Sequence, residues 1–227
     1  GKQTYANFEV CVVSELAQAG LTDYEGIPKF RLVLFNGTAH EQLKAAEKML
    51  NGAYFLQLLP GDLPAPDALH MLVLQTHANP EAEVVFADED SVIDGIRQNP
   101  IFKPDYGRDT LRSFNSIGRP MLVSKRVHTA VGGFRGSTPA ELWAYCIDCA
   151  SVAKQVIHIA RIGLTVIRDC DGSEIPCTDI LKREFNSLYP GDGSGKKNRT
   201  NGYCFEGSVL GLSLIHISEP TRLRRIS

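Results

Sequence analysis

Three consecutive acidic residues, Asp88, Glu89 and Asp90, follow the apolar run Val84-Val85-Phe86-Ala87 in the segment FADED. Carboxylate oxygens are hard ligands that suit Mg²⁺ and Mn²⁺, and a bound cation can stabilise an anionic leaving group. The same residues would also arise at the polar end of a buried strand, which needs no ligand. The segment alone therefore indicates either a metal site that takes part in chemistry or a structural strand end.

Two further patterns suggest chemistry but fit a structural explanation better. Cys146 and Cys149 form a CxxC in a helical pattern, where both thiols share one apolar face, so packing in the core is favoured over a zinc site. Gly195-Lys196 resembles part of a phosphate-binding loop. That motif needs a glycine where Pro190 stands and Ser or Thr where Lys197 stands, so we reject a phosphate-binding loop.

The composition is that of an ordinary globular protein. The chain has 227 residues, of which 43% are hydrophobic and 22% charged, with a formal net charge of -2. This length suits one large domain or two small ones, and the charge argues against a nucleic-acid partner. No apolar run approaches the roughly 20 residues that span a bilayer. The six cysteines, spread through a core-rich chain, indicate free thiols in a reducing compartment.

Alternating strands and helices must position the acidic segment. After residue 90 the pattern becomes rich in loops, with Gly95, Pro100 and Pro104. The alternation favours an α/β fold in which helices cover both faces of a parallel sheet. The predicted strands are 8–13, 30–35, 53–59, 83–87 (which ends in the acidic segment), 121–123, 156–159 and 164–167, and the predicted helices start at Thr38, Pro66 and Thr138.

We expect the chain to divide into three parts. Residues 1–190 form the folded domain, and the polar, glycine-rich residues 191–211 form a linker. Residues 212–227 begin with LSLIHISEPTR, which resembles the translation of a transposase adapter used in DNA sequencing libraries. We therefore predict a non-native tail outside the fold, with a natural amphipathic tail as the alternative.

Four motifs, in a fixed order, resemble the family 2 glycosyltransferases of bacteria. They are Asp88-Glu89-Asp90, Lys103-Pro104-Asp105, Ile117-Gly118 and Gly132-Gly133-Phe134, and a weaker similarity extends the match to residues 3–167. The resemblance implies a GT-A fold, a doubly wound and mainly parallel sheet with helices on both faces. Such a sheet binds a nucleotide-diphosphate sugar at the carboxyl ends of its strands.

The chemistry implied by this resemblance is inverting glycosyl transfer in the synthesis of a polysaccharide or glycoconjugate. A carboxylate takes the proton of an acceptor hydroxyl, and a divalent metal, Mg²⁺ or Mn²⁺, neutralises the diphosphate leaving group. The expected partners are the nucleotide-sugar donor and a saccharide acceptor, with no nucleic acid. The resemblance also implies a further glycosyltransferase domain in the full-length protein. The expected location is the cytoplasm, with a peripheral position at the inner face of the membrane.

The chain departs from the family pattern at its beginning. The first strand of the family is missing, and that strand is central in the sheet. Its loss would leave two neighbouring strands without a ladder partner, so we expect residues 1–190 alone to be marginally stable. The second strand of the family usually carries acidic residues for the base or ribose, and here only Glu15 can take that part.

The remaining site residues follow from the resemblance, each with a structural alternative. Asp62 is the single carboxylate left in the metal loop, where Leu59 replaces another. Glu141 is the nearest candidate for the catalytic base, but it also completes a capping box that opens a helix, which is the favoured interpretation. Lys103 lies beside the diphosphate or is only solvated.

The opening acidic segment also acquires a role from the resemblance. Asp88 and Asp90 are expected to shape the floor of the donor–acceptor site, with direct metal binding the lesser alternative. Two functions follow: an active glycosyltransferase domain with a weakened metal site, or a degenerate, inactive GT-A module that binds a ligand or a partner domain.

Overall fold

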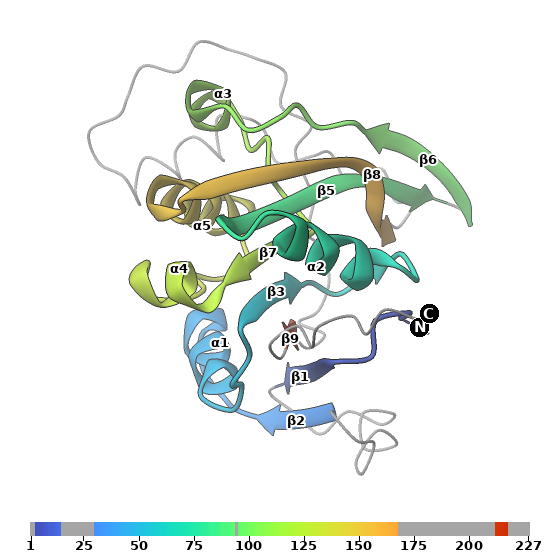
Figure 1. The fold of residues 1–227 in the computed structure, drawn as a ribbon. Coiled ribbons are helices and arrows are strands. Elements are labelled where there is room, and N and C mark those ends of the chain that lie inside the picture. The colour runs from blue at the N-terminus through green and yellow to red at the C-terminus, as the bar shows by residue number, and fades with distance from the viewer. Residues whose placement is uncertain (1–2, 15–29, 94, 168–211, 218–227) are drawn as a thin grey trace, which may run out of the picture.

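The computed structural model describes residues 3–14, 30–93, 95–167 and 212–217. In these ranges the chain forms one nine-stranded sheet with the order β2-β1-β9-β3-β7-β5-β8-β4, and β6 pairs with the far end of β5 (Figure 1). The strands are β1 (Phe8–Ser14), β2 (Phe30–Leu34), β3 (Tyr54–Leu58), β4 (Asp62–Pro64), β5 (Ala82–Ile93), β6 (Ile96–Ile101), β7 (Met121–Ser124), β8 (Gln155–Ile167) and β9 (Leu212–Ile217).

The sheet is mixed rather than mainly parallel. β1 runs parallel to β2 and β5 to β8, but β7 and β9 each lie antiparallel to both of their neighbours. Because each reversed strand separates two others, β1, β2, β3, β5 and β8 still point the same way. The carboxyl ends of β1, β3 and β5 therefore meet at one edge of the sheet, where open α/β sheets bind ligands.

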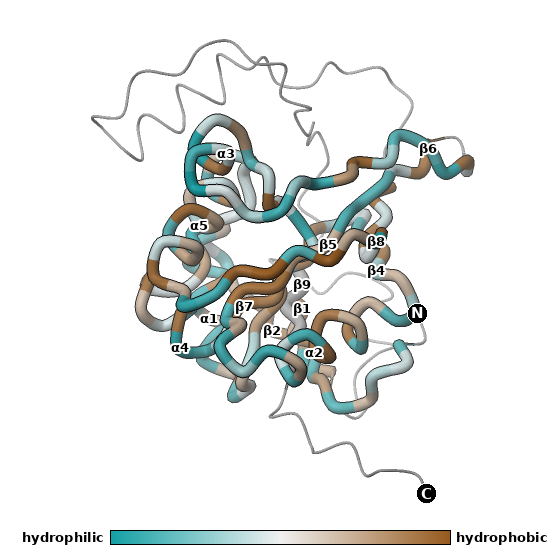
Figure 2. Tube along the Cα trace, turned by 45° about the horizontal axis from the view of Figure 1, so that its top comes forward, coloured by the Kyte–Doolittle hydropathy of each residue, from teal (hydrophilic) through white to brown (hydrophobic). Residues whose placement is uncertain are grey.

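Helices cover both faces of the sheet, as expected. They are α1 (Ala39–Glu47), α2 (Ala68–Ala78), α3 (Arg108–Ser113), α4 (Lys125–Ala130) and α5 (Pro139–Val152). Along β5, Val84 and Phe86 pack with α1, α3, α4 and α5, whereas Val85 and Ala87 pack with α2. The alternation of side chains along a strand thus builds two cores from one apolar run, and the hydrophobic colouring follows these central strands (Figure 2).

The predictions that rest on residues close together in the sequence are confirmed for two helix starts and for two buried cysteines. Thr38 with Glu41 and Thr138 with Glu141 form the two predicted capping boxes, which open α1 and α5. Cys146 and Cys149 are buried on α5 in the core, so the packing interpretation is confirmed for them. No helix in the described ranges combines the length and apolar character needed to span a bilayer.

Three element boundaries differ from the predictions. β5 continues to Ile93, so the acidic segment lies inside a strand and not at its end. The section expected to be a loop contains β6, which turns back on β5 and projects from the sheet (Figure 1). The two late strands are one long strand, β8. Pairing with β6 and β8 extends β5 past the point where its apolar run stops.

The place between β1 and β3 is filled by β9, from the segment that we expected to lie outside the fold. β9 pairs antiparallel with β1 from Phe8 to Val13 and with β3 from Tyr54 to Leu58. The expected gap in the ladder is therefore absent. An extended segment in this position satisfies the backbone groups of both strands, which would otherwise be costly to bury.

We predict that β9 is required for a stable sheet. A chain ending at Gly211 should lose its cooperative thermal transition, because β1 and β3 would each lose a ladder partner. Hydrogen exchange should show rapid exchange of the β1 and β3 amides. A chain ending at Ile217 is the matched control and should unfold like the whole protein. Equal melting of the two shortened chains would contradict the assignment of β9 to the sheet.

Candidate functional site at the carboxyl edge of the sheet

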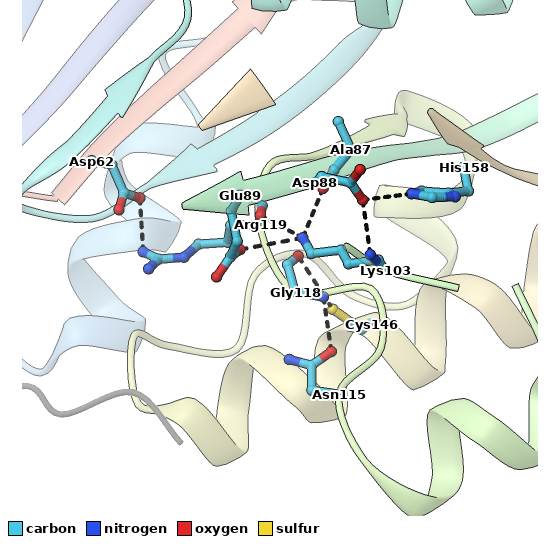
Figure 3. A network of polar contacts seen from close by, with 10 residues as sticks. All are labelled: Asp62, Ala87, Asp88, Glu89, Lys103, Asn115, Gly118, Arg119, Cys146 and His158. Carbon is cyan, nitrogen blue, oxygen red and sulfur yellow. Dashed lines mark hydrogen bonds and ion pairs between the residues drawn. The ribbon is translucent and has the colours of Figure 1, made fainter. Parts of the chain in front are cut away.

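The acidic segment meets a buried lysine beside the residues that precede β7. The Lys103 ammonium lies 3.2 Å from the Glu89 carboxylate, with both side chains almost fully buried. It donates to the carbonyl oxygens of Ala87 at 2.8 Å and Arg119 at 2.6 Å (Figure 3). Burial lowers the pKa of Lys103, and the Glu89 charge opposes that effect. Lys103 is thus a structural cation inside the protein, and the expectation of a solvated side chain was wrong.

Asp88 and Asp90 are also held by internal partners. Asp88 accepts hydrogen bonds from the Lys103 amide at 2.9 Å and lies 2.8 Å from the ring of His158 on β8. Asp90 pairs with Arg97 of β6 at 2.7 Å. The buried acids therefore join β5 to β6, β8 and the segment before α3. These contacts join elements of the fold, and the expectation that Asp88 and Asp90 shape the floor of a donor–acceptor site stays a prediction.

Asp62, the expected metal ligand, is paired with an arginine. Its Oδ2 accepts from Arg119 Nη1 at 2.7 Å and from the Leu59 amide at 2.8 Å. The Asp62 side chain is fully buried, and that of Arg119 is 7% exposed. Burial raises the pKa of Asp62 to about 6, although the Arg119 charge works in the opposite direction.

The described residues around Asp62 do not fit a divalent metal. The guanidinium already holds Oδ2, so a cation there would meet an existing positive charge. Oδ1 is buried without a hydrogen-bond partner in the described structure, which leaves one free carboxylate oxygen where such metals take several oxygen ligands. Leu59 packs into the core, so replacing it by Asp would bury a charge there instead of completing a metal site.

A small pocket, with a cavity volume of about 20 Å³ and partly open to solvent, lies at the carboxyl edge of the sheet. Gln57 near the end of β3 and Met121 at the start of β7 line it, because β7 begins at the edge where β3 ends. Arg119 is its charged lining residue. The complete lining is Gln57, Gly118, Arg119, Met121, Phe134, Leu142, Tyr145 and Cys146.

The glycine of the Ile117-Gly118 motif lets this wall approach the buried lysine. Gly118 has φ +54, which side-chain-bearing residues rarely adopt, and a Cβ there would lie 3.4 Å from Lys103 Nζ. Its amide donates to the side chain of Asn115 at 3.0 Å (Figure 3). Gly118 therefore lets the backbone pass close to Lys103 and its partners, and this sets the position of the Arg119 backbone.

Glu141 stands beside the pocket but is engaged as a helix cap. Its Oε2 accepts from the Ser137 amide at 3.1 Å and from the amide and hydroxyl of Thr138 at 3.0 and 2.8 Å. A Cβ on Gly136 would overlap this carboxylate. The next residue, Leu142, lines the pocket. The structure thus shows the capping role, and a catalytic role for Glu141 stays a prediction.

Another part of the pocket lining is Phe134, which ends the Gly132-Gly133-Phe134 turn, and Glu47 fixes this turn. Glu47 Oε1 accepts from the Phe134 amide at 2.7 Å, and Oε2 pairs with Lys44 at 2.9 Å. Gly133 has φ +86, and a Cβ there would overlap both of these charged groups. The motif therefore needs glycine because the end of α1 presses an ion pair against the turn.

Two side chains of the site were not expected from the sequence. Arg119 directly follows the Ile117-Gly118 motif and precedes the apolar strand β7. An arginine next to a buried strand is a signal from which its place in the site could have been predicted. His158 had no such signal, because only the register of β8 against β5 brings it to Asp88. Glu15 lies outside the described residues.

Comparisons with known proteins agree with this architecture. An uncharacterized protein y4gI of Sinorhizobium fredii (strain NBRC 101917 / NGR234) is 31% identical over 173 residues, which is 70% of this chain and 19% of that protein. The O-antigen biosynthesis protein RfbC of Myxococcus xanthus is 36% identical over 75 residues, 33% of this chain and 6% of that protein. The chain thus spans about a fifth or less of the length of these curated relatives. No family model matches it.

The structural comparison identifies the fold. The crystal structure of the 1–349 portion of TarS from S. aureus superposes with a TM-score of 0.59 at 14% identity, covering 73% of this chain and 53% of that one. TarS is a glycosyltransferase. The α/β class that the motifs implied is therefore confirmed, and the fold is one that a glycosyltransferase uses.

We predict that the buried lysine is essential for stability. Lys103→Met should lower the free energy of unfolding by about 3–5 kcal/mol, since it leaves the buried Glu89 carboxylate without its cation. Chemical denaturation measures this loss. Lys125→Met, at an exposed position, is the matched control and should change stability little. A stable Lys103→Met variant would show that the network is not a structural support.

A second prediction concerns pH. Burial alone would raise the pKa of Glu47, but the bonds from His128, Lys44 and the Phe134 amide outweigh it and hold the pKa below its ordinary value of 4.5. The unfolded chain therefore takes up this proton first as the pH falls. The stabilisation by Glu47 is complete above 4.5 and is lost as the pH falls through the lower, folded-state pKa.

Urea unfolding from neutral to acid pH tests this linkage. The stability gap between wild type and Glu47→Gln should be largest near neutral pH and should shrink in acid. Glu81→Gln removes an exposed carboxylate and should give a small gap throughout. A gap for Glu47→Gln that does not change with pH would rule out the linkage.

Proposed function

We propose that this chain is a glycosyltransferase domain that transfers a sugar, with inversion, from a nucleotide-diphosphate sugar to a saccharide acceptor. The observation that carries the proposal is the position of the pocket, at the carboxyl edge of a sheet whose fold matches TarS. Ligands of open α/β sheets bind at that edge. The similarity to RfbC, named for O-antigen biosynthesis, supports a polysaccharide or glycoconjugate as the product.

The proposed reaction needs one proton acceptor and one cation. The acceptor oxygen attacks the anomeric carbon from the face opposite the diphosphate, the bond from that carbon to the diphosphate oxygen breaks, and the hydroxyl proton passes to a carboxylate. Glu141 is the proposed base because it opens α5 beside the pocket residue Leu142. It must first loosen the capping bonds that stabilise its charged form. Asp88, Asp90 and Lys103 support the floor beneath.

A second candidate is a module that binds a ligand or partner domain without catalysis. It is favoured by the engagement of the expected metal ligand and of the expected base, since Asp62 is bound to Arg119 and Glu141 to its own helix start. The two candidates share the fold and the pocket and differ in turnover alone.

The whole protein is proposed to contain more than this domain. Because the chain spans a small part of y4gI and RfbC, a further glycosyltransferase domain is proposed to accompany it. A cytoplasmic site of action, close to the inner face of the membrane, would suit assembly of a surface polysaccharide.

Turnover of a panel of nucleotide sugars tests the proposal. Wild type should release nucleoside diphosphate from at least one donor, in the presence of saccharide acceptors. Glu141→Gln should lower kcat about 100-fold or more, as expected for loss of a general base, with donor binding preserved. Glu81→Gln, at an exposed site, should leave kcat unchanged. Donor binding without turnover would favour the non-catalytic module, and absence of both would refute the enzyme.

A further inference from the structure

Arg119 places a positive charge at the wall of the pocket. It directly precedes β7 at the carboxyl edge and lines the pocket. Its carbonyl is held by the buried ammonium of Lys103 at 2.6 Å, and its guanidinium by Asp62 at 2.7 Å. Both ends of the residue are therefore fixed by partners that are themselves buried (Figure 3).

The chemistry of the guanidinium suits an anionic ligand. A guanidinium carries five N–H donors in a planar fork, so it can hold a carboxylate and a phosphate together. It keeps its charge at all accessible pH values, and phosphate oxygens match its spacing. Asp62, fully buried with Oδ1 unpartnered in the described structure, supplies a carboxylate that orients the guanidinium.

The same contacts argue against a divalent cation at this point. A metal at Asp62 would lie beside the Arg119 charge, and the described residues offer no group of three His, Cys, Asp or Glu side chains that could complete its ligands. Leu59, the other position of the expected metal loop, packs into the core. A fixed organic cation thus stands where the family pattern leads one to expect a metal.

We propose that Arg119, oriented by Asp62, binds the diphosphate of the donor, so that donor binding by this chain does not require a divalent metal. This inference rests on the proposed function, since it assigns the cation of that same site. Arg119 would be a specificity determinant for diphosphates and, through contact with the leaving group, a catalytic residue. The buried Lys103 network acts indirectly, by holding the Arg119 backbone in place.

Calorimetric titration with UDP and with inorganic pyrophosphate tests the proposal on the wild-type chain. Each probe is measured once with EDTA and once with Mn²⁺. We expect dissociation constants that agree within about threefold between the two conditions, because the guanidinium is present in both. Binding of either probe that needs Mn²⁺ would overturn the inference and leave the proposed glycosyltransferase intact.

Variants then identify the cation. Arg119→Gln combined with Asp62→Asn removes both charges together, which avoids leaving one of them buried alone. It should weaken pyrophosphate binding in EDTA about tenfold or more, the loss expected for a charge-assisted contact. Arg126→Gln removes an exposed arginine paired with Glu83 and should bind as wild type does. The thermal transition of each variant is recorded beside its titration.

The outcomes separate the two proposals. Unchanged pyrophosphate binding by the double variant would overturn the role of Arg119 while donor turnover by the wild type still supports the enzyme. Wild-type turnover that persists in EDTA supports both. If UDP, pyrophosphate and every donor of the panel fail to bind, with or without Mn²⁺, the proposed function itself fails and this inference with it. Should the double variant not fold, the metal comparison on the wild type decides alone.

Discussion

The buried ammonium of Lys103 is the contact on which the arrangement at the carboxyl edge depends. β7 accompanies β5 only as far as Phe86, and beyond that point the edge of β5 needs other partners. Lys103 supplies them by binding the Ala87 and Arg119 carbonyls and facing Glu89. A charge buried in this way is tolerable only because every side of it meets a carbonyl or a carboxylate.

The consequences of this contact reach the pocket. Lys103 holds the backbone of Arg119, and Gly118 lets that backbone come close, so the guanidinium starts from a fixed point and meets Asp62. On the other side, the ion pair of Glu47 fixes the turn that ends in Phe134. The pocket thus lies between two walls, each held by buried or half-buried charges. These fixed charges keep both walls in place.

At the centre of the sheet, the backbone N–H and C=O groups of β1 and β3 find their hydrogen-bond partners in another strand and not in a side chain. β1 and β3 point the same way, and β9 runs between them in the opposite direction. An antiparallel strand can pair fully with two such neighbours, since each ladder is independent of the direction of the other. The strands that form the site edge therefore stay in one continuous sheet with β5, from which the charged network extends.

Much of the fold could be predicted from local chemistry. The apolar runs gave β1, β3 and β5, the capping boxes gave the starts of α1 and α5, and four short motifs gave the glycosyltransferase-type fold that TarS shares. These signals are local because a strand alternates its side chains and a cap bonds its own first turn, so neighbouring residues carry the information. The burial of Cys146 and Cys149 followed from the same periodicity.

What only the tertiary structure decided is the pairing of charges across long separations. Asp62 and Arg119 are 57 residues apart, and Asp88 and His158 are 70 apart. No periodicity relates such residues, so the sequence indicated a metal ligand in Asp62 and a solvated or phosphate-facing cation in Lys103. The structure instead gives each a buried partner of opposite charge. The sequence determined which residues could do chemistry at this edge. The packing of β5, β7 and β8 determined which of them are already paired. The reason is that burying an unpaired charge is costly, so each buried charge pairs with an opposite charge that the fold places beside it.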